Sequence, residues 1–182
     1  MLMGENVFRI RRAFIVPLVI VIVLLFILLV ISSFKGQAWE RIILAAFFVF
    51  TSFLSIEVMR RELLLSESGL IIKKFFRVKE FSWDQITHLG IVRLGKKVYF
   101  LLTTVKGFHF FSNLVEDHAR LVRLLDERLG AEKVEEEVRN YLEQPVERLS
   151  LIVMSWVYVA VILAVIFFKL YYVSLLSGYF VK

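Results

Sequence analysis

Side chains able to do chemistry are few and scattered in this chain of 182 residues. Cysteine is absent, which excludes disulfides, thiolate nucleophiles and cysteine-ligated metal centres. The histidines His88, His109 and His118 fall on two expected strands and one expected helix, without the close spacing or the accompanying acids of a metal site. We therefore predict no metal site and no cofactor.

Three other motifs lack the partners that a reaction needs. Ser66 and Ser68 have acidic neighbours but no convincing histidine partner, and serines of this kind normally shape turns. The acids of Glu135–Glu137 point to different sides of a helix and are expected to form a solvated face. Gly95-Lys96-Lys97 lacks the glycine-rich approach and the following Ser or Thr of a phosphate loop. We expect no catalytic residues and no enzymatic activity.

Uneven charge is the most informative chemical feature. Residues 60–107 hold ten Lys or Arg against four Asp or Glu, whereas residues 112–148 hold six against ten. Cations of the basic part are expected to contact anionic lipid headgroups or a partner, each contributing about 1 kcal/mol within a Debye length of the charged surface. These residues are Lys73, Lys74, Arg77, Lys79, Lys96 and Lys97. In a second interpretation, which stays open, they are solvated loop residues that reflect positive-inside bias alone.

Nucleic acid is not expected as a partner. The chain carries a formal net charge of +6, but much of it flanks apolar segments. Residues 60–148 carry 16 Lys or Arg and 14 Asp or Glu, a balance of only +2. Hydrophobic residues make up 59% of the chain, more than a soluble domain of this size buries, so much of the apolar surface must face lipid.

The first apolar run covers residues 13–34, which is 22 residues without a charge. As a helix it would rise about 33 Å, enough to cross a hydrocarbon core of about 30 Å. Arg9, Arg11 and Arg12 precede it, and the positive-inside rule then predicts a cytoplasmic N-terminus. A cleaved signal peptide is the competing interpretation, but the run is too long for the apolar h-region of a typical signal peptide, and we expect a retained anchor.

The second apolar run, residues 42–56, has only 15 uncharged residues and must borrow its flanks to span. A helix over residues 38–59 would place Glu57 at the inner boundary near Arg60 and Arg61. We expect a structural ion pair there, with a functional buried carboxylate as the alternative. The first two runs then form a hairpin with both ends in the cytoplasm.

The third apolar run, residues 149–168, predicts a last span that leaves the C-terminus outside. Residues 170–182 would form an interfacial tail. Lys169 is expected to be a snorkelling anchor at the outer boundary. The alternative is one long tilted helix continuing through Val173, which would put Lys169 at membrane depth.

The segment between the second and third spans changes to short strand-like runs separated by turn signals, which predict an antiparallel meander. The runs are residues 62–66, 69–76, 79–83, 86–94, 97–103 and 108–111. Asn113 and Glu116 have the spacing of a capping box, which predicts a helix that Gly130 stops. Residues 131–148 are expected to form an amphipathic connector helix.

The aromatic residues of this segment outnumber what one small core needs, so some are expected to face a partner or the bilayer. Neighbours on a strand point to opposite faces, and one member of each adjacent pair is therefore the exposed candidate. The set comprises Phe75, Phe76, Phe81, Trp83, Tyr99, Phe100, Phe108, Phe110 and Phe111.

Antiparallel strands followed by one amphipathic helix resemble the pleckstrin-homology (PH) architecture. Residues 62–70, the step Phe81-Ser82-Trp83-Asp84-Gln85-Ile86 and the strand Gly107-Phe108-His109-Phe110 look like those of bacterial membrane-linked PH-like domains. The resemblance covers residues 62–129. It implies a binding or scaffolding module that self-associates or packs on a membrane partner, with no catalytic residues to carry over.

The same resemblance bears on phosphoinositides. Lys74 with Arg77 and Lys79 partly imitates the basic residues with which eukaryotic PH relatives hold these lipids. The first strand, residues 62–66, contains no lysine, and a tight Glu-Ser-Gly turn follows it. Specific phosphoinositide recognition is therefore not expected.

We predict an α+β protein of the bacterial inner membrane with three transmembrane helices. Residues 1–59 would form the transmembrane hairpin, residues 60–130 a cytoplasmic PH-like β-barrel or sandwich capped by a helix, residues 131–148 the connector, and residues 149–182 the last span and its tail. The expected function is that of a non-enzymatic scaffold that binds anionic lipid and a membrane protein or a second copy. An accessory subunit of a transporter or membrane enzyme and an anionic-lipid sensor are the alternatives.

Overall fold

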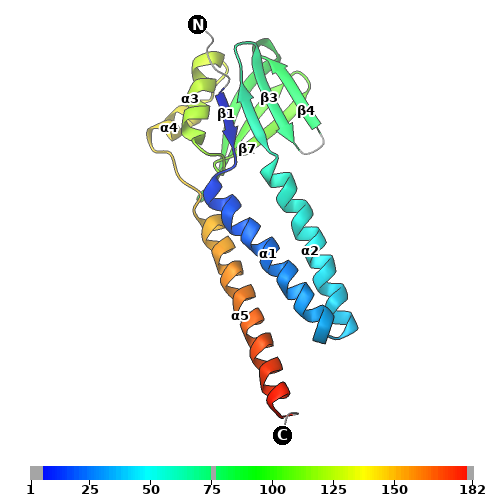
Figure 1. The fold of residues 1–182 in the computed structure, drawn as a ribbon. Helices are drawn as coiled ribbons and strands as arrows, with labels where there is room; N and C mark the ends of the chain where they lie inside the picture. The colour runs from blue at the N-terminus through cyan, green and yellow to red at the C-terminus, as the bar shows by residue number, and fades with distance from the viewer. Residues whose placement is uncertain (1–5, 75–76, 180–182) are drawn as a thin grey trace. The chain divides into compact units, whose positions relative to one another are not determined.

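The computed structural model describes residues 6–74 and 77–179, and the chain falls into two compact units. Within the described residues, the β-domain comprises residues 6–12 and 56–150, and the helical unit comprises residues 13–55 and 151–179. Figure 1 shows the helices and strands of both units. The fold is α+β, with five α-helices and two antiparallel sheets in the described part of the chain.

Three of the helices are long and apolar enough to cross a membrane. They are α1 (Arg12–Lys35), α2 (Ala38–Met59) and α5 (Ser150–Tyr179). Helices α1 and α2 match the predicted ranges 13–34 and 38–59 to within one residue. The third differs, because α5 does not end at Phe168 but runs on without a break, as in the alternative prediction. No proline or further charge between Lys169 and Tyr179 stops it, so residues 170–179 of the expected separate tail are part of this helix.

The helical unit is held together around α1. Val21 and Leu25 of α1 are buried together with Val159 of α5. Phe48 of α2 packs against this cluster, and its ring lies 5.9 Å from the ring of Phe26 in α1. The remaining surface of these helices is largely exposed and apolar, as expected of segments that lipid surrounds.

Two antiparallel sheets form the β-domain. The first contains β1 (Asn6–Arg9), β2 (Glu62–Leu65), β3 (Gly69–Lys74) and β4 (Arg77–Ser82), in that order. The second contains β5 (Ile86–Leu94), β6 (Lys97–Thr104) and β7 (Gly107–Ser112), in that order. Each of the six predicted runs contains a strand, although Trp83 belongs to a 3₁₀ turn (Trp83–Gln85) after β4.

Strand β1 was not expected, since residues 1–59 were assigned to the transmembrane hairpin. It pairs along its whole length with β2, from Asn6 opposite Leu65 to Arg9 opposite Glu62. The α1–α2 hairpin is therefore an insertion between two neighbouring strands of one sheet. With four residues, of which only Phe8 is buried, β1 is too short to carry a periodic signal.

The helix after β7 is α3 (His118–Leu129), and it starts later than the capping-box prediction. Asp117 precedes it in the left-handed conformation with φ 50°, and Asn113 is buried in the domain instead of capping the helix. The predicted stop at Gly130 is confirmed, where a φ of 77° suits glycine.

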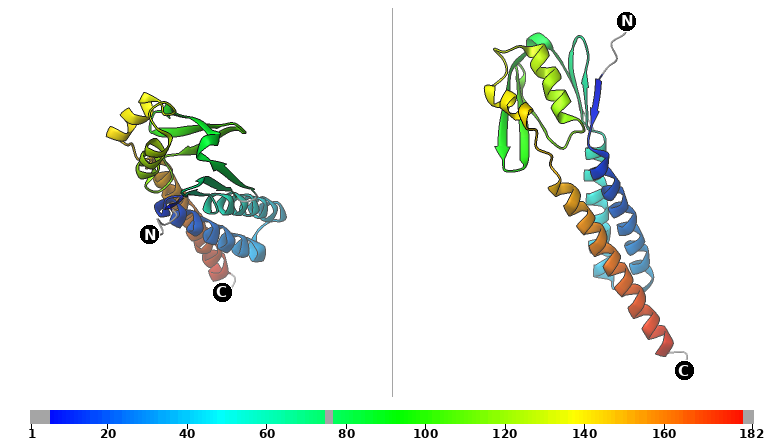
Figure 2. Two further views of the ribbon diagram at one scale, coloured as in Figure 1. Left: turned by 90° about the horizontal axis from the view of Figure 1, so that it is seen from above. Right: turned by 90° about the vertical axis from the view of Figure 1, so that its left-hand side faces the viewer.

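The predicted connector over residues 131–148 is a short helix, α4 (Glu136–Glu143), that belongs to the β-domain. Val138 and Tyr141 are fully buried, and Val134 forms a parallel bridge with Leu89 of β5. Figure 2 shows α3 and α4 together on one side of the sheets. Val134, Val138 and Tyr141 of this amphipathic stretch therefore complete the core of the β-domain.

The domain core lies between the sheets and these two helices. Phe100 of β6 is its centre, with ring centroids 5.0 Å from Phe111 and 5.4 Å from Tyr141. Leu121 and Leu125 of α3 are fully buried as well. Full burial of an aliphatic or aromatic side chain contributes about 1.5–3 kcal/mol, so this cluster holds the second sheet to the helices.

Candidate interaction sites

The chain enters and leaves the β-domain at one end, here called the stem (residues 9–12, 57–62 and 145–150). Arg9 lies opposite Glu62 and contacts its carboxylate at 2.8 Å. Arg11 donates to Glu147 at 2.5 and 3.1 Å. This interaction lowers the pKa of Glu147 and raises that of Arg11. The start of α1, the end of α2 and the start of α5 therefore join the β-domain at the same place.

Four of the six predicted contact residues lie on the β3–β4 hairpin. Lys74 is directly opposite Arg77, and Lys79 is opposite Ile72. Cross-strand partners share a face and alternate residues along a strand point the same way, so Lys74, Arg77 and Lys79 lie on one face and Lys73 on the other. Glu62 of the stem is opposite Lys73, so this hairpin ends near the stem.

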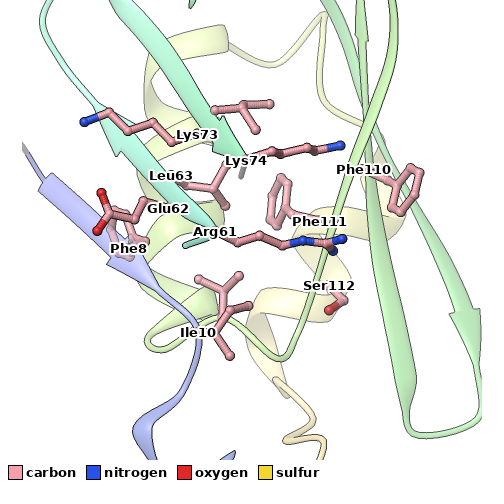
Figure 3. Close-up of a pocket in the computed structure, with 12 residues that line it drawn as sticks. Phe8, Ile10, Arg61, Glu62, Leu63, Lys73, Lys74, Phe110, Phe111 and Ser112 are labelled. Atoms are coloured by element: carbon pink, nitrogen blue, oxygen red, sulfur yellow. The ribbon is translucent and has the colours of Figure 1, made fainter. Parts of the chain in front are cut away.

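A small cavity of about 60 Å³ opens beside these residues (Figure 3). Its apolar lining comes from both sheets and consists of Phe8, Ile10, Leu63, Ile72, Phe110, Phe111 and Val115. In Figure 3, Arg61 and Lys74 extend to the same side, toward Phe110, whereas Lys73 points away from them. The Lys74 ammonium lies 5.7 Å from the centre of the Phe110 ring. The arrangement is an apolar opening with a basic rim.

Arg61 is also the partner of Glu57, for which a structural ion pair was expected. The two side chains form an i,i+4 ion pair at 2.5 Å, as predicted from their spacing. The charge of Arg61 at the cavity rim is therefore balanced by Glu57. Lys74, in contrast, has no carboxylate partner among the ion pairs of the described residues.

The other two predicted contact residues lie apart from that cavity, Lys96 in the β5–β6 turn and Lys97 at the start of β6. Asn113 ties this turn to the stem, because its side-chain amide donates to the carbonyls of Lys96 at 3.2 Å and Val146 at 2.8 Å. Its oxygen accepts from the Val98 N–H at 3.3 Å. The β3–β4 hairpin is therefore connected to the stem by strand pairing at Glu62 and Lys73, and the β5–β6 hairpin by the hydrogen bonds of Asn113.

The histidines have separate surroundings. His118 shares a hydrogen bond of 2.8 Å with the Tyr141 hydroxyl, and His88 lies 2.8 Å from Glu135. His109 packs on Phe81, and its buried Nε2 has no hydrogen-bond partner in the described part of the chain. Burial, followed by repulsion from Lys79 and Lys74, lowers the pKa of His109. Across residues 6–74 and 77–179, no three His, Asp or Glu side chains gather in a way that could hold a metal ion.

The exposed aromatics cluster on β7, an edge strand of the second sheet. Phe108 is 70% exposed and Phe110 63% exposed, while their neighbour Phe111 is buried. The prediction of one exposed member in each adjacent pair is confirmed for Phe110 and Phe111. The corresponding pair Phe75 and Phe76 lies outside the described residues.

A polar cluster in the helical unit joins one residue from each candidate span. Lys169 of α5 donates to Glu40 of α2 and to the Ser32 hydroxyl of α1. Ser32 is fully buried and donates to Glu40 at 3.2 Å. Lys169 is therefore paired, which its isolation in the sequence did not indicate. No local pattern in the sequence indicates this cluster, because Ser32 and Glu40 lie 137 and 129 residues before Lys169.

These features define an α+β protein with three helices able to span a membrane and a β-domain of two antiparallel sheets. A family model described as "Family of unknown function (DUF6585)" matches residues 1–160, and the chain belongs to this family. No curated protein matches the chain, and no solved structure does.

Proposed function

We propose that this protein is a non-enzymatic, membrane-anchored interaction module with a PH-like β-domain. The observation that carries the proposal is the meeting of cations and chain attachments at the stem. Lys74 lies at the cavity rim with Arg61, and Lys96 is tied through Asn113 to Val146. Cations held where a domain joins its membrane helices are placed to contact anionic headgroups.

The PH-like assignment is supported by the order of elements. Sheets of four and three antiparallel strands precede α3, an amphipathic helix that buries Leu121 and Leu125 against them. Strand β1 supplies an additional strand to the first sheet, so the transmembrane hairpin would be an insertion within the PH-like domain.

A cytoplasmic β-domain follows from the positive-inside rule. All three helices have arginines where they join the stem, and these are Arg9, Arg11, Arg12, Arg60, Arg61 and Arg148. The α1–α2 connection instead carries Lys35, Glu40 and Arg41. We place the stem inside, the α1–α2 turn outside and the end of α5 outside, in a bacterial inner membrane as the family resemblance implies.

The partner surface that we propose is the edge of the second sheet. An edge strand leaves backbone groups free to pair with another chain, and exposed aromatics commonly anchor interfaces. Strand β7 offers both, through Phe108 and Phe110. The partner is a membrane protein or a second copy of the chain.

Co-purification tests this proposal. The intact protein is isolated from its native membrane in mild detergent, and the stoichiometry of what remains bound is measured by mass spectrometry. We expect a companion or a second copy at fixed ratio, lost in a Phe108→Ser, Phe110→Ser double variant. Val105→Ser is the matched control, since Val105 is 73% exposed in the adjacent turn. A wild-type protein that is monomeric and alone would contradict the proposal.

Two alternatives are each favoured by a particular observation. The polar cluster of Ser32, Glu40 and Lys169 favours an accessory subunit, whose companion would be a larger polytopic protein. The basic-rimmed cavity favours an anionic-lipid sensor, whose association with anionic vesicles would fall steeply with salt. The identity of the co-purified companion and the salt response separate the three functions.

A further inference from the structure

Arg148 is a buried cation in the stem. It lies two residues before α5 and is only 8% exposed. Its Nε atom is buried, and the described residues offer it neither a hydrogen-bond partner nor an ion pair. Its guanidinium instead lies 5.8 Å from the centre of the Tyr99 ring. A guanidinium stays protonated in proteins, and buried charges are normally paired with an anion.

The neighbouring carboxylate does not serve this purpose. Glu147 accepts both hydrogen bonds from Arg11, at 2.5 and 3.1 Å. That pairing lowers the pKa of Glu147 and keeps it ionised, but directs its charge to the start of α1. Arg148 is therefore adjacent in the sequence to Glu147, whose carboxylate is already paired with Arg11.

Further cations come to the same part of the stem. Lys97 and Tyr99 are alternate residues of β6 and point to the same face of the sheet, on which Arg148 lies over the Tyr99 ring. The carbonyl of Lys96 and that of Val146 are both held by Asn113. The β5–β6 turn is thus fixed beside the segment that carries Arg148.

We infer that Arg148, with Lys96 and Lys97, binds one phosphate group, carried by a membrane lipid. A guanidinium fork matches the oxygens of a phosphate, and a cation–π contact such as that with Tyr99 uses none of the hydrogen-bond donors of the guanidinium. The position directly before a candidate span is where headgroup phosphates lie. The inference deepens the proposed membrane anchorage and rests on it, but uses none of the residues of the cavity or of β7.

The test is lipid retention by the intact protein in detergent. Delipidated protein is titrated with phosphatidylglycerol or phosphatidylcholine, and bound lipid is counted by native mass spectrometry. We expect wild type to bind one phosphatidylglycerol about tenfold more tightly than Arg148→Gln does. Arg148→Lys should fall in between, because it keeps the charge but loses the fork. Arg123→Gln, which changes an exposed arginine of α3, should match wild type.

Inorganic phosphate separates the two sources of the group. Stabilisation of wild type by millimolar sodium phosphate beyond sodium chloride of equal ionic strength, without lipid retention, would assign the site to a free phosphate and overturn the lipid source. Equal phosphatidylglycerol retention by wild type and Arg148→Gln would overturn the phosphate site altogether. Lys97→Gln changes an exposed side chain that folding does not require, and should weaken binding about threefold; unchanged binding there would also count against the site. Loss of this lipid leaves the β7 co-purification test unaffected, so the two proposals fail separately.

Discussion

Lys169 on α5 and Glu40 on α2 form an ion pair, and Ser32 on α1 is hydrogen-bonded to both. Lys169 is the 20th residue of α5, Ser32 the 21st of α1, and Glu40 lies 19 residues before the end of α2. Each is therefore about 28–30 Å along its helix from the stem, close to the thickness of a hydrocarbon core. The cluster therefore joins the three helices at the level of the proposed outer boundary of the bilayer.

Breaking this cluster should weaken the helical unit. Lys169→Met leaves the Glu40 carboxylate without its cation, and we expect a loss of about 1–3 kcal/mol in the free energy of unfolding. Thermal unfolding of the intact protein in mild detergent measures it. The exchanged pair Lys169→Glu, Glu40→Lys should recover part of the loss. If Lys169→Met is as stable as wild type, the cluster does not hold the helices together.

Asn113 should contribute more to the free energy of unfolding than the exposed Asn140 does. It is 1% exposed and satisfies the Val98 N–H and the carbonyls of Lys96 and Val146. Asn113→Ala leaves these groups without their partner and is expected to cost about 3 kcal/mol. Asn140→Ala, on the exposed side of α4, is the matched control and should change stability by less than about 0.5 kcal/mol. Equal effects in chemical denaturation would contradict this role.

Acid should destabilise the β-domain through its buried histidines. Burial first, then Lys79 and Lys74, lowers the pKa of His109, and burial lowers that of His118. The unfolded chain then binds protons more readily than the folded one, so stability is complete above about pH 6.5 and falls as the pH drops below it. His109→Phe keeps the ring contact with Phe81 and should reduce this loss between pH 7.5 and 5.0 in thermal unfolding. An unchanged pH dependence would mean that His109 does not titrate as described.

The basic hairpin should bias orientation in the membrane. Each cation within a Debye length of an anionic surface contributes about 1 kcal/mol, so reversing Lys73, Lys74 and Arg77 to Glu removes several kcal/mol of attraction. We expect a less uniform orientation in phosphatidylglycerol vesicles, measured by protease accessibility of the β-domain. Reversal of three cations on the α3 side, namely Arg123, Arg128 and Lys133, is the control. Unchanged orientation and complex formation in the hairpin variant would remove the basic hairpin from the account.

Local patterns were sufficient for much of the fold. Apolar runs of 20 or more residues, or 15 with usable flanks, predicted three helices because span length is set by the bilayer. The six strand-like runs matched strands because turn residues separate them, as Gly95 does between β5 and β6. Glu57 and Arg61 were paired correctly because i,i+4 neighbours face each other on a helix.

Features that depend on distant parts of the chain were missed. Asn113 has the spacing of a helix cap, but the backbone groups of Lys96 and Val146 compete for its side chain in the folded domain. Strand β1 is recognisable only through β2, which lies more than 50 residues away. The basic residues were assigned as one set, whereas the structure divides them between two hairpins because strand pairing, not sequence proximity, decides where each turn lies.

The most direct test of an interaction module is to ask what touches β7 in the native membrane. A photoreactive benzoylphenylalanine at position 108 replaces an exposed aromatic with another of similar shape, and position 132, exposed before α4, serves as control. We predict a cross-linked protein band of one defined mass from position 108, corresponding to a companion or a second copy, and none from position 132. Cross-links from position 108 to lipid alone, or no cross-link at all, would contradict the account.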